Sequence, residues 1–234
     1  MGVIYESVGS RMNLSSENEI ITFKDLTFKY KDIIENGPVD LSFYPESQKG
    51  KGNNLWTSNA NYPIYLYSGD DYIMLNDYLR KDVINEKYTE SQLKSWVWLL
   101  HSAIIMDSNN SRKVNKDQIV YKGINKPSSN IDWKIGDEFC FAEFLSTSKN
   151  FFIAKRFALG NIILVIRLRS TRQECDYCKY IEDITQYKGE EEVLINPYCL
   201  YKVKKIKGNT FYLDCYGEKL LLQDTFFYPQ DNWP

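Results

Sequence analysis

The chain has 234 residues, enough for one well-packed domain with a modest extension and too few for three domains. It carries 29 Lys and Arg against 31 Asp and Glu, so its formal net charge is −2 and it lacks the basic surplus of a dedicated nucleic-acid-binding protein. No apolar run approaches the roughly 20 residues that span a bilayer, so we expect neither nucleic acid nor membrane as a partner.

The N-terminal sequence MGVIYESVGS lacks the apolar stretch of a secretory signal peptide. Gly2 invites comparison with myristoylation sites, but Glu6 occupies the position where Ser or Thr is required. The chain has 5 cysteines, and an odd number without an export signal predicts reduced thiols rather than a disulfide framework. Together these features predict a cytoplasmic protein.

Histidine occurs once, at His101, inside an apolar helical pattern. A single histidine excludes multi-histidine zinc sites and argues against a Ser-His-Asp or Cys-His hydrolase. Cys175 and Cys178 have the spacing of half a zinc knuckle, but no second C-x-x-C or C-x-x-H completes it. We therefore predict no metal site, and the chemistry is left to carboxylates, hydroxyls, Lys, Arg or a cofactor.

Residues 1–62 differ in sequence pattern and composition from the remainder of the chain. We predict that they form an N-terminal extension that lies against the main domain, residues 63–234. Within the extension, residues 20–30 alternate apolar and polar side chains, which favours a β-strand. Residues 46–61 are rich in Gly, Asn, Ser and Lys, which predicts a long loop.

Two helices are predicted next. The first covers residues 72–79, where apolar residues recur at helical spacing. Before the second, Thr89 and Gln92 form a capping box, in which the hydroxyl faces the amide three residues on and the Gln side chain reaches back. An apolar stripe at i, i+3, i+4 and i+7 spacing follows over residues 93–104. His101 lies beside this stripe and is predicted to be half-buried and structural.

From residue 118 onward the pattern changes to short strands, interrupted by a helix at about residues 150–159 that ends near Gly160. The predicted strands are residues 119–124, 138–145, 161–168, 192–207 and 210–215. Helices followed mainly by strands predict an α+β fold rather than a doubly wound α/β fold. The chain also lacks the glycine-rich phosphate-binding turns of Rossmann and P-loop proteins.

Three consecutive carboxylates, Glu190, Glu191 and Glu192, precede the apolar residues 193–195. Because side chains alternate along a strand, we expect Glu190 and Glu192 to share a face while Glu191 points away. Two acids on one face repel each other unless a cation or a hydroxyl lies between them, which indicates a site. The alternative is a solvated acidic entrance to the strand, and the three glutamates by themselves favour it.

Two further segments carry candidate polar groups. Ser146 and Ser148 fall on one side of a predicted strand end, and Thr147 falls on the other. Ser148 can serve as the N-cap of the helix that follows, but a hydroxyl here can equally orient a carboxylate from a neighbouring strand. The other segment is the Tyr-Lys-Gly sequence at residues 121–123.

The order and spacing of these segments resemble the arginine-specific mono-ADP-ribosyltransferase family. That family has a strand of the form Y-R-G, then S-T-S followed by a helix, then E-x-E leading into V-L-I. This chain has Y-K-G at residues 121–123, S-T-S at 146–148 and E-E-E-V-L-I at 190–195. Upstream, residues 67–80 resemble the helical preamble of the family, and the resemblance covers roughly residues 65–216.

The resemblance implies an α+β, ADP-ribosyltransferase-like fold, with N-terminal helices and two packed, mostly antiparallel sheets around an NAD cleft. It also implies NAD as co-substrate, a protein arginine as acceptor and no metal, and we expect a monomer. ADP-ribosyl transfer breaks the nicotinamide–ribose bond through an oxocarbenium-like transition state, much as glycoside hydrolysis proceeds. Nicotinamide leaves as a neutral group, so the reaction needs an ionised carboxylate near the ribose rather than a general acid.

By resemblance, Glu192 is that catalytic carboxylate. Ser146 would orient Glu192 and contact the nicotinamide ribose. Glu190 would bind and orient the acceptor guanidinium, and Tyr187 would pack on the same group by a cation–π contact. These assignments make Tyr187 and Glu190 the residues that meet the acceptor.

The resemblance assigns three more residues to NAD. Gly123 would offer backbone groups to the carboxamide, because its missing side chain permits close approach. Phe157 would stack on the nicotinamide ring, although its helical spacing alone favours a place in the core. Lys122 would neutralise the diphosphate.

Lys122 is also a departure from the family, which usually has Arg here. Arg presents a planar fork to phosphate oxygens, whereas Lys is a point charge on a flexible stem. The departure leaves open a catalytically weak or inactive NAD-binding protein. Independently of Lys122, an NAD glycohydrolase that passes ADP-ribose to water is a further alternative. The departure also argues against the His-Tyr-Glu branch of the superfamily, the poly-ADP-ribose polymerases, which need histidine at this position.

Overall fold

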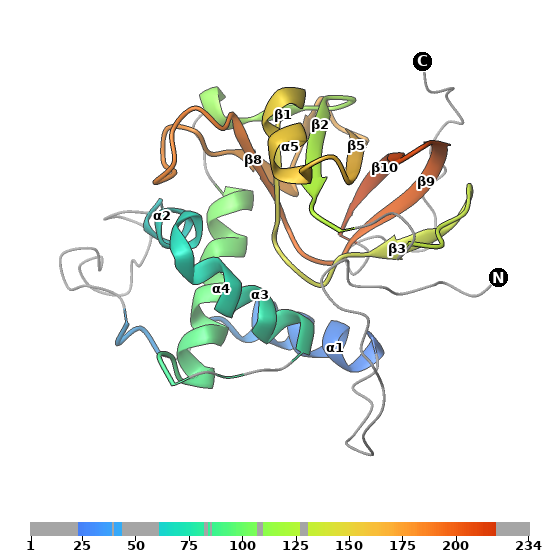
Figure 1. The fold of residues 1–234 in the computed structure, drawn as a ribbon. Helices are drawn as coiled ribbons and strands as arrows, with labels where there is room; N and C mark the ends of the chain where they lie inside the picture. The colour runs from blue at the N-terminus through green and yellow to red at the C-terminus, as the bar shows by residue number, and fades with distance from the viewer. Residues whose placement is uncertain are drawn as a thin grey trace.

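Most helices gather on one side of the molecule and most strands on the other (Figure 1), which confirms the predicted α+β class. The computed structural model describes residues 23–38, 40–43, 61–81, 84, 86–106, 110–126 and 131–218. Among these residues, no helix combines the length and the hydropathy that a bilayer span requires.

The predicted helices at residues 72–79, 93–104 and 150–159 are all present. The helices are α1 (Phe23–Asn36), α2 (Tyr62–Leu66), the π-helix η2 (Tyr67–Asp71), α3 (Tyr72–Lys81), α4 (Glu90–Met106), the short 3-10 helix η3 (Asn110–Arg112) and α5 (Phe151–Ala158). The capping box before α4 is confirmed: the Thr89 amide donates to Gln92 Oε1 at 2.8 Å, and the Gln92 amide donates to Thr89 Oγ1 at 3.3 Å.

Helix α5 begins and ends with local signals. The Asn150 side chain accepts a hydrogen bond from the Phe152 amide, so Asn150 rather than Ser148 caps the helix. Leu159 and Gly160 both adopt positive φ, 48° and 84°, which ends the helix where the sequence predicted.

The strand predicted for residues 20–30 is wrong, because α1 begins at Phe23. Tyr30 and Ile33 lie three residues apart and are both buried, which is helical spacing. The Tyr30 hydroxyl lies 2.7 Å from His101 Nδ1 on α4, and α1 packs along α4. The alternation over residues 20–30 was therefore outweighed by packing contacts that a short window cannot reveal. The loop predicted for residues 46–61 lies outside the described residues except for Asn61.

His101 has the predicted structural role, although it was predicted to be half-buried. It is buried, and burial lowers its pKa to about 4, so the ring is neutral at pH 7. Its contact with Tyr30 joins α4 to α1 in the helical core.

Among the described residues, the strands form one eight-stranded sheet and one two-stranded sheet. The strands are β1 (Val114–Asn115), β2 (Ile119–Ile124), β3 (Glu138–Cys140), β4 (Leu145–Ser148), β5 (Ile162–Leu168), β6 (Glu174–Cys175), β7 (Cys178–Tyr180), β8 (Glu192–Ile195), β9 (Cys199–Lys207) and β10 (Thr210–Glu218). The large sheet has the order β3-β9-β10-β5-β2-β4-β8-β7, and the small sheet pairs β1 with β6. In the large sheet, β10 and β5 are parallel, and the other neighbours are antiparallel.

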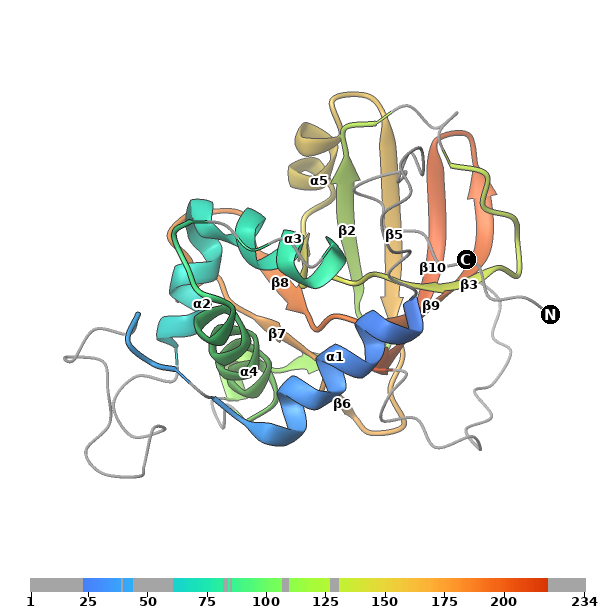
Figure 2. The same cartoon turned by 90° about the horizontal axis from the view of Figure 1, so that it is seen from below.

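The large sheet consists of two halves that meet at β2 and β4. β2 pairs with β5 along its whole length, but it meets β4 through the single pair Tyr121↔Ser148. Figure 2 shows β7 and β8 running across the direction of β2, β5 and β10. The two halves thus diverge from one seam, and a space can open beside it.

Two long predicted strands are each divided in the structure. The segment predicted at residues 138–145 becomes β3 and β4, which lie in different halves of the sheet. The backbone of Phe144 leaves the ladder because its amide donates to Asn76 Oδ1 and its carbonyl accepts from the Tyr67 hydroxyl. The segment predicted at residues 192–207 becomes β8 and β9, and Tyr198 between them has a φ of 58°.

Candidate active site

A cleft of about 490 Å³ lies beside the seam between β2 and β4. That volume is within the usual range for small-molecule sites. Every residue that the sequence assigned to the site lines this one cleft: Lys122, Gly123, Ser146, Phe157, Tyr187, Glu190 and Glu192. The topology explains this convergence, since β2, β4 and β8 are neighbours and α5 directly follows β4.

The sequence did not assign the opposite wall of the cleft to the site. Tyr67, Ser68, Gly69 and Asp70 of η2 line it, together with Tyr72 at the start of α3. Residues 67–80 resembled the helical preamble of the family, but that resemblance assigned none of them to the site. The backbone of Gly69 is non-helical, with φ −87° and ψ −156°, so η2 is a kink between α2 and α3 rather than a regular helix.

Glu192 is a buried carboxylate, only 6% exposed, at the first position of β8. Burial raises its pKa above the ordinary value for glutamate, and the charge of Glu190 adds to that effect. The hydrogen bond from Ser146 opposes the rise most strongly, followed by the positive charge of Lys122 and a hydrogen bond from Thr185. The carboxylate is thus removed from water but supported by groups that favour its ionised form.

The three glutamates adopt a turn before they enter the strand. Glu191 has a φ of 48°, so Glu190 lies before the first residue of β8. Glu190 and Glu192 do face the same cleft, but this turn, and not strand alternation, brings them together. Glu191 points elsewhere, because its carboxylate accepts from Asn150 Nδ2 at 2.9 Å.

Hydrogen bonds hold this turn in place from several sides. Ser148 Oγ donates to the Glu190 carbonyl at 2.6 Å, and the Lys149 amide donates to the Glu191 carbonyl at 3.0 Å. The Glu182 carboxylate accepts from the amides of Gly189 and Glu191. The conformation of the turn is therefore fixed by these hydrogen bonds. This argues against the alternative that the three glutamates are only a solvated entrance to the strand.

Glu190 is half-buried near the surface of the cleft. Its pKa is raised, first by burial and then by the charge of Glu182, while the positive charge of Arg156 acts in the opposite direction. The negative charge of the Glu190 carboxylate is thus only partly compensated, and such a carboxylate attracts a cation such as a guanidinium.

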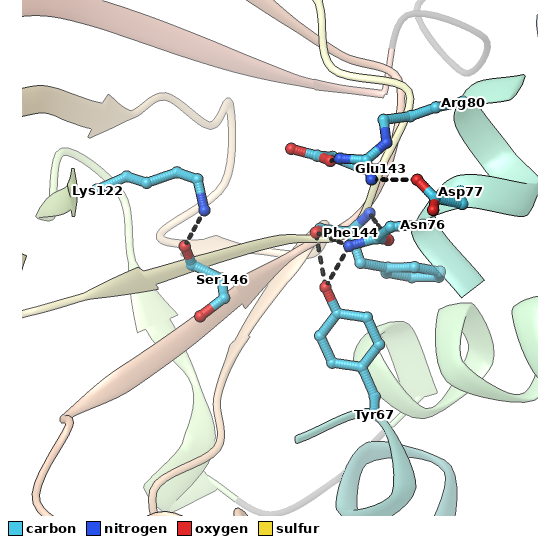
Figure 3. A network of polar contacts seen from close by, with 8 residues as sticks. All are labelled: Tyr67, Asn76, Asp77, Arg80, Lys122, Glu143, Phe144 and Ser146. Carbon is cyan, nitrogen blue, oxygen red and sulfur yellow. Dashed lines mark hydrogen bonds and ion pairs between the residues drawn. The ribbon is translucent and has the colours of Figure 1, made fainter. Parts of the chain in front are cut away.

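Lys122 reaches across the seam from β2. Its Nζ donates to the Ser146 carbonyl at 3.1 Å (Figure 3). Burial lowers its pKa and the positive charge of Arg80 adds to that effect, whereas the negative charges of Glu143 and Glu192 act to raise it. The lysine thus contacts a backbone oxygen, feels the charge of two acids and lines the cleft.

A network of polar contacts behind Lys122 anchors the start of β4 to the helices (Figure 3). Arg80 of α3 pairs with the buried Glu143 and, at 2.6 Å, with Asp77. Asn76 Nδ2 donates to the Phe144 carbonyl at 3.3 Å and to the Tyr67 hydroxyl at 3.0 Å. The network fixes the position of β4, and hence of Ser146, relative to the wall formed by η2.

Gly123 has a structural requirement that the sequence did not reveal. A Cβ at this position would lie 2.5 Å from the backbone nitrogen of Ala158 and closer still to the backbone oxygen of Ala154. The close approach that the missing side chain permits is therefore that of α5 against β2.

Two aromatic side chains stand at the mouth of the cleft. Phe157 is 53% exposed, so it is not the core residue that its helical spacing favoured. Tyr187 is 52% exposed, and its hydroxyl lies 3.5 Å from Asp70 Oδ1 across the opening. Both rings can therefore contact a molecule that enters the cleft.

The fold is that of the ADP-ribosyltransferases. Residues 42–227 match the family model described as ADP-ribosyltransferase exoenzyme, and the chain belongs to that family. No curated protein matches it by sequence.

Several solved structures share the fold. Vis, an ADP-ribosyltransferase from Vibrio splendidus solved in complex with agmatine, is 18% identical with a TM-score of 0.54, and the match covers 88% of this chain and 91% of Vis. The ADP-ribosylating toxin BECa of C. perfringens, solved with NADH, is 20% identical with a TM-score of 0.52, covering 81% of this chain and 48% of the toxin. A mutant of the eukaryotic mono-ADP-ribosyltransferase ART2.2, solved with NAD, is 18% identical with a TM-score of 0.53, covering 84% of this chain and 77% of that one.

Proposed function

We propose that the chain is an NAD-dependent protein-arginine mono-ADP-ribosyltransferase, which transfers ADP-ribose from NAD to an acceptor guanidinium and releases nicotinamide. The observation that carries the proposal is the buried Glu192 carboxylate, which shares one cleft with Lys122 and Ser146. Similar folds that were solved with NADH, with NAD and with agmatine support both the donor and the class of acceptor.

The reaction demands a fixed negative charge where the ribose becomes cationic. Cleavage of the nicotinamide–ribose bond spreads positive charge over the ribose C1 and ring oxygen, and nicotinamide departs without a proton. An ionised Glu192 stabilises that charge, and the water-poor surroundings strengthen the interaction. Ser146 holds the carboxylate by a hydrogen bond and so fixes its direction.

The remaining walls of the cleft suit the other parts of NAD. Lys122 supplies a positive charge on the cleft floor for the diphosphate. Phe157 offers an exposed ring for stacking on nicotinamide, and Gly123 lines the same cleft. A cleft of about 490 Å³ with a cation, a carboxylate and aromatic rings fits such a ligand.

The acceptor meets the outer part of the cleft. Glu190 lies on the turn before Glu192, and Tyr187 stands at the opening. A carboxylate and an exposed aromatic ring together favour a guanidinium, which pairs with the first and stacks on the second. On this proposal the acceptor nitrogen approaches the ribose from the side of Glu190.

Replacing Glu190 by Gln tests the acceptor role. We expect nicotinamide release from NAD without acceptor to remain within about threefold of wild type, because Glu192 is untouched. Transfer to agmatine is expected to fall at least about tenfold, since a charge-assisted hydrogen bond worth roughly 1.5–3 kcal/mol is lost. Labelled NAD with and without agmatine measures both rates, and an equal loss of the two rates would remove Glu190 from the acceptor site.

A catalytically weak NAD-binding protein is the second candidate, and Lys122 is the observation that favours it. We expect wild type to turn over and Lys122→Arg to lower the KM for NAD about tenfold, because the guanidinium fork binds phosphate oxygens in pairs. Nicotinamide release follows the rate, and quenching of Trp fluorescence follows NAD binding. Binding without nicotinamide release by either protein would favour the second candidate, and free ADP-ribose without a modified acceptor would indicate a glycohydrolase.

A further inference from the structure

Thr185 is a buried threonine in the turn that connects β7 to β8. It is 2% exposed, whereas the next residues of the turn, from Gln186 to Gly189, are exposed. The Ile181 amide donates to the Glu192 carbonyl at 2.9 Å, and the Thr185 amide donates to the Ile181 carbonyl at 2.9 Å. These two bonds fold the turn back so that Thr185 lies against the first residue of β8.

The Thr185 hydroxyl lies between two groups of the site. Its oxygen accepts a hydrogen bond from the Tyr187 amide at 3.2 Å, and the hydroxyl is one of the groups that lower the pKa of the Glu192 carboxylate. A hydroxyl has one donor and two acceptor positions, and an ionised carboxylate only accepts. The hydroxyl proton therefore goes to Glu192, and a lone pair is left for Tyr187.

We propose that Thr185 is a positioning residue, which holds the Glu192 carboxylate in its reactive orientation and, through the same oxygen, fixes the backbone of Tyr187 at the acceptor side of the cleft. The inference rests on the proposed function, because it assigns Glu192 to the ribose and Tyr187 to the acceptor. Thr185 does not line the cleft. It links the two parts of the site that must act on the same ribose carbon.

The charges around Glu192 set the sign of the expected effect. Glu190 lies on its own turn, Lys122 reaches it from β2, and the phenol of Tyr67 faces it from η2. Burial and Glu190 raise the pKa of Glu192, while Ser146, Lys122 and Thr185 oppose the rise. Removing the Thr185 hydroxyl deletes one of the opposing groups, so the pKa of Glu192 is expected to move further up.

The test compares Thr185→Val, which removes the hydroxyl at nearly constant volume, with Thr185→Ser, which retains it. Activity requires ionised Glu192, so nicotinamide release rises with pH through the pKa of that group. We expect Thr185→Val to shift this acid limb to higher pH, to lower the rate at pH 7 about 10- to 100-fold and to raise the KM for agmatine. Thr185→Ser is expected to keep the wild-type limb.

Ser95→Ala is a control outside the cleft. Ser95 also carries a buried hydroxyl, which donates to the Ser91 carbonyl at 2.8 Å rather than to a carboxylate. Its loss is expected to lower the melting temperature without moving the acid limb. A buried hydroxyl with a merely structural role at position 185 would give this same result for Thr185→Val.

Two outcomes would overturn the inference while leaving the proposed function standing. One is an acid limb of Thr185→Val at the wild-type pH, and the other is a Thr185→Ser protein that behaves like Thr185→Val. If Thr185→Val does not fold, Thr185→Ala carries the same expectation, since it also removes the hydroxyl. Wild-type protein that releases no nicotinamide would overturn the proposed function and this inference together.

Discussion

Replacing Glu192 by Gln is expected to lower nicotinamide release from NAD by at least about 10³-fold, whether or not agmatine is present. The carboxylate is the group that meets the cationic ribose, and an amide of the same shape supplies no charge. Loss of a single pre-organised electrostatic contact in a water-poor site typically costs about 10²–10³ in rate, and loss of a full charge costs more. Single-turnover assays with labelled NAD measure the effect.

The same substitution is not expected to unfold the protein. Burial raises the pKa of Glu192 in the folded state, so the folded protein binds this proton more tightly than the unfolded chain does. The stability that comes with the protonated form is complete below the unfolded pKa and is lost as pH rises through the folded pKa. At pH 7 the ionised carboxylate therefore destabilises the fold, and the neutral Gln should melt at the same temperature as wild type or a few degrees above it.

Glu191→Gln is the control for Glu192→Gln, because it makes the same change one residue away. Glu191 accepts from Asn150 and does not line the cleft. We expect its nicotinamide release to stay within about threefold of wild type, the small change expected away from the reacting atoms. Activity retained by Glu192→Gln, or lost equally in both proteins, would contradict the assignment of Glu192.

Local patterns predicted most elements from α3 onward. The capping box at Thr89, the strand at residues 119–124 and the positive φ at Gly160 all depend on neighbours in the sequence, so a window of ten residues contains the information. Local patterns gave the wrong structure where contacts between residues far apart in the sequence determine it. α1 is a helix because Tyr30 meets His101, and the break between β3 and β4 depends on Asn76, 68 residues from Phe144.

The candidate site shows the same division. The motifs at residues 121–123, 146–148 and 190–192 predicted which side chains would line one cleft, and the order of β2, β4 and β8 in the sheet brings them together. No motif assigned the wall formed by η2, because this segment is a kink at the non-helical backbone of Gly69 and has no periodic pattern. Thr185 was not predicted either, since one threonine in a turn has no signal of its own.

Gly123→Ala is expected to have the largest effect on stability. In the middle of a strand, Ala is ordinarily more stable than Gly by roughly 0.5–1 kcal/mol, because it loses less conformational entropy on folding. Here the added Cβ would meet the backbone of α5 at Ala154 and Ala158, and backbone atoms cannot rotate away. We expect a net loss of about 3 kcal/mol, at the upper end of overpacking effects, and a melting temperature lower by roughly 6–12 °C.

Gly69→Ala separates this effect from the general cost of filling space beside a glycine. A Cβ at Gly69 would lie 2.5 Å from Gln186 Nε2, the far end of a flexible side chain that can swing aside. The φ of Gly69 is −87°, so the backbone imposes no penalty for a left-handed conformation. Its melting temperature should fall less than half as far. Because α5 carries Phe157, Gly123→Ala should also weaken NAD binding, and an Ala variant that melts at the wild-type temperature would show that α5 does not pack on β2 as described.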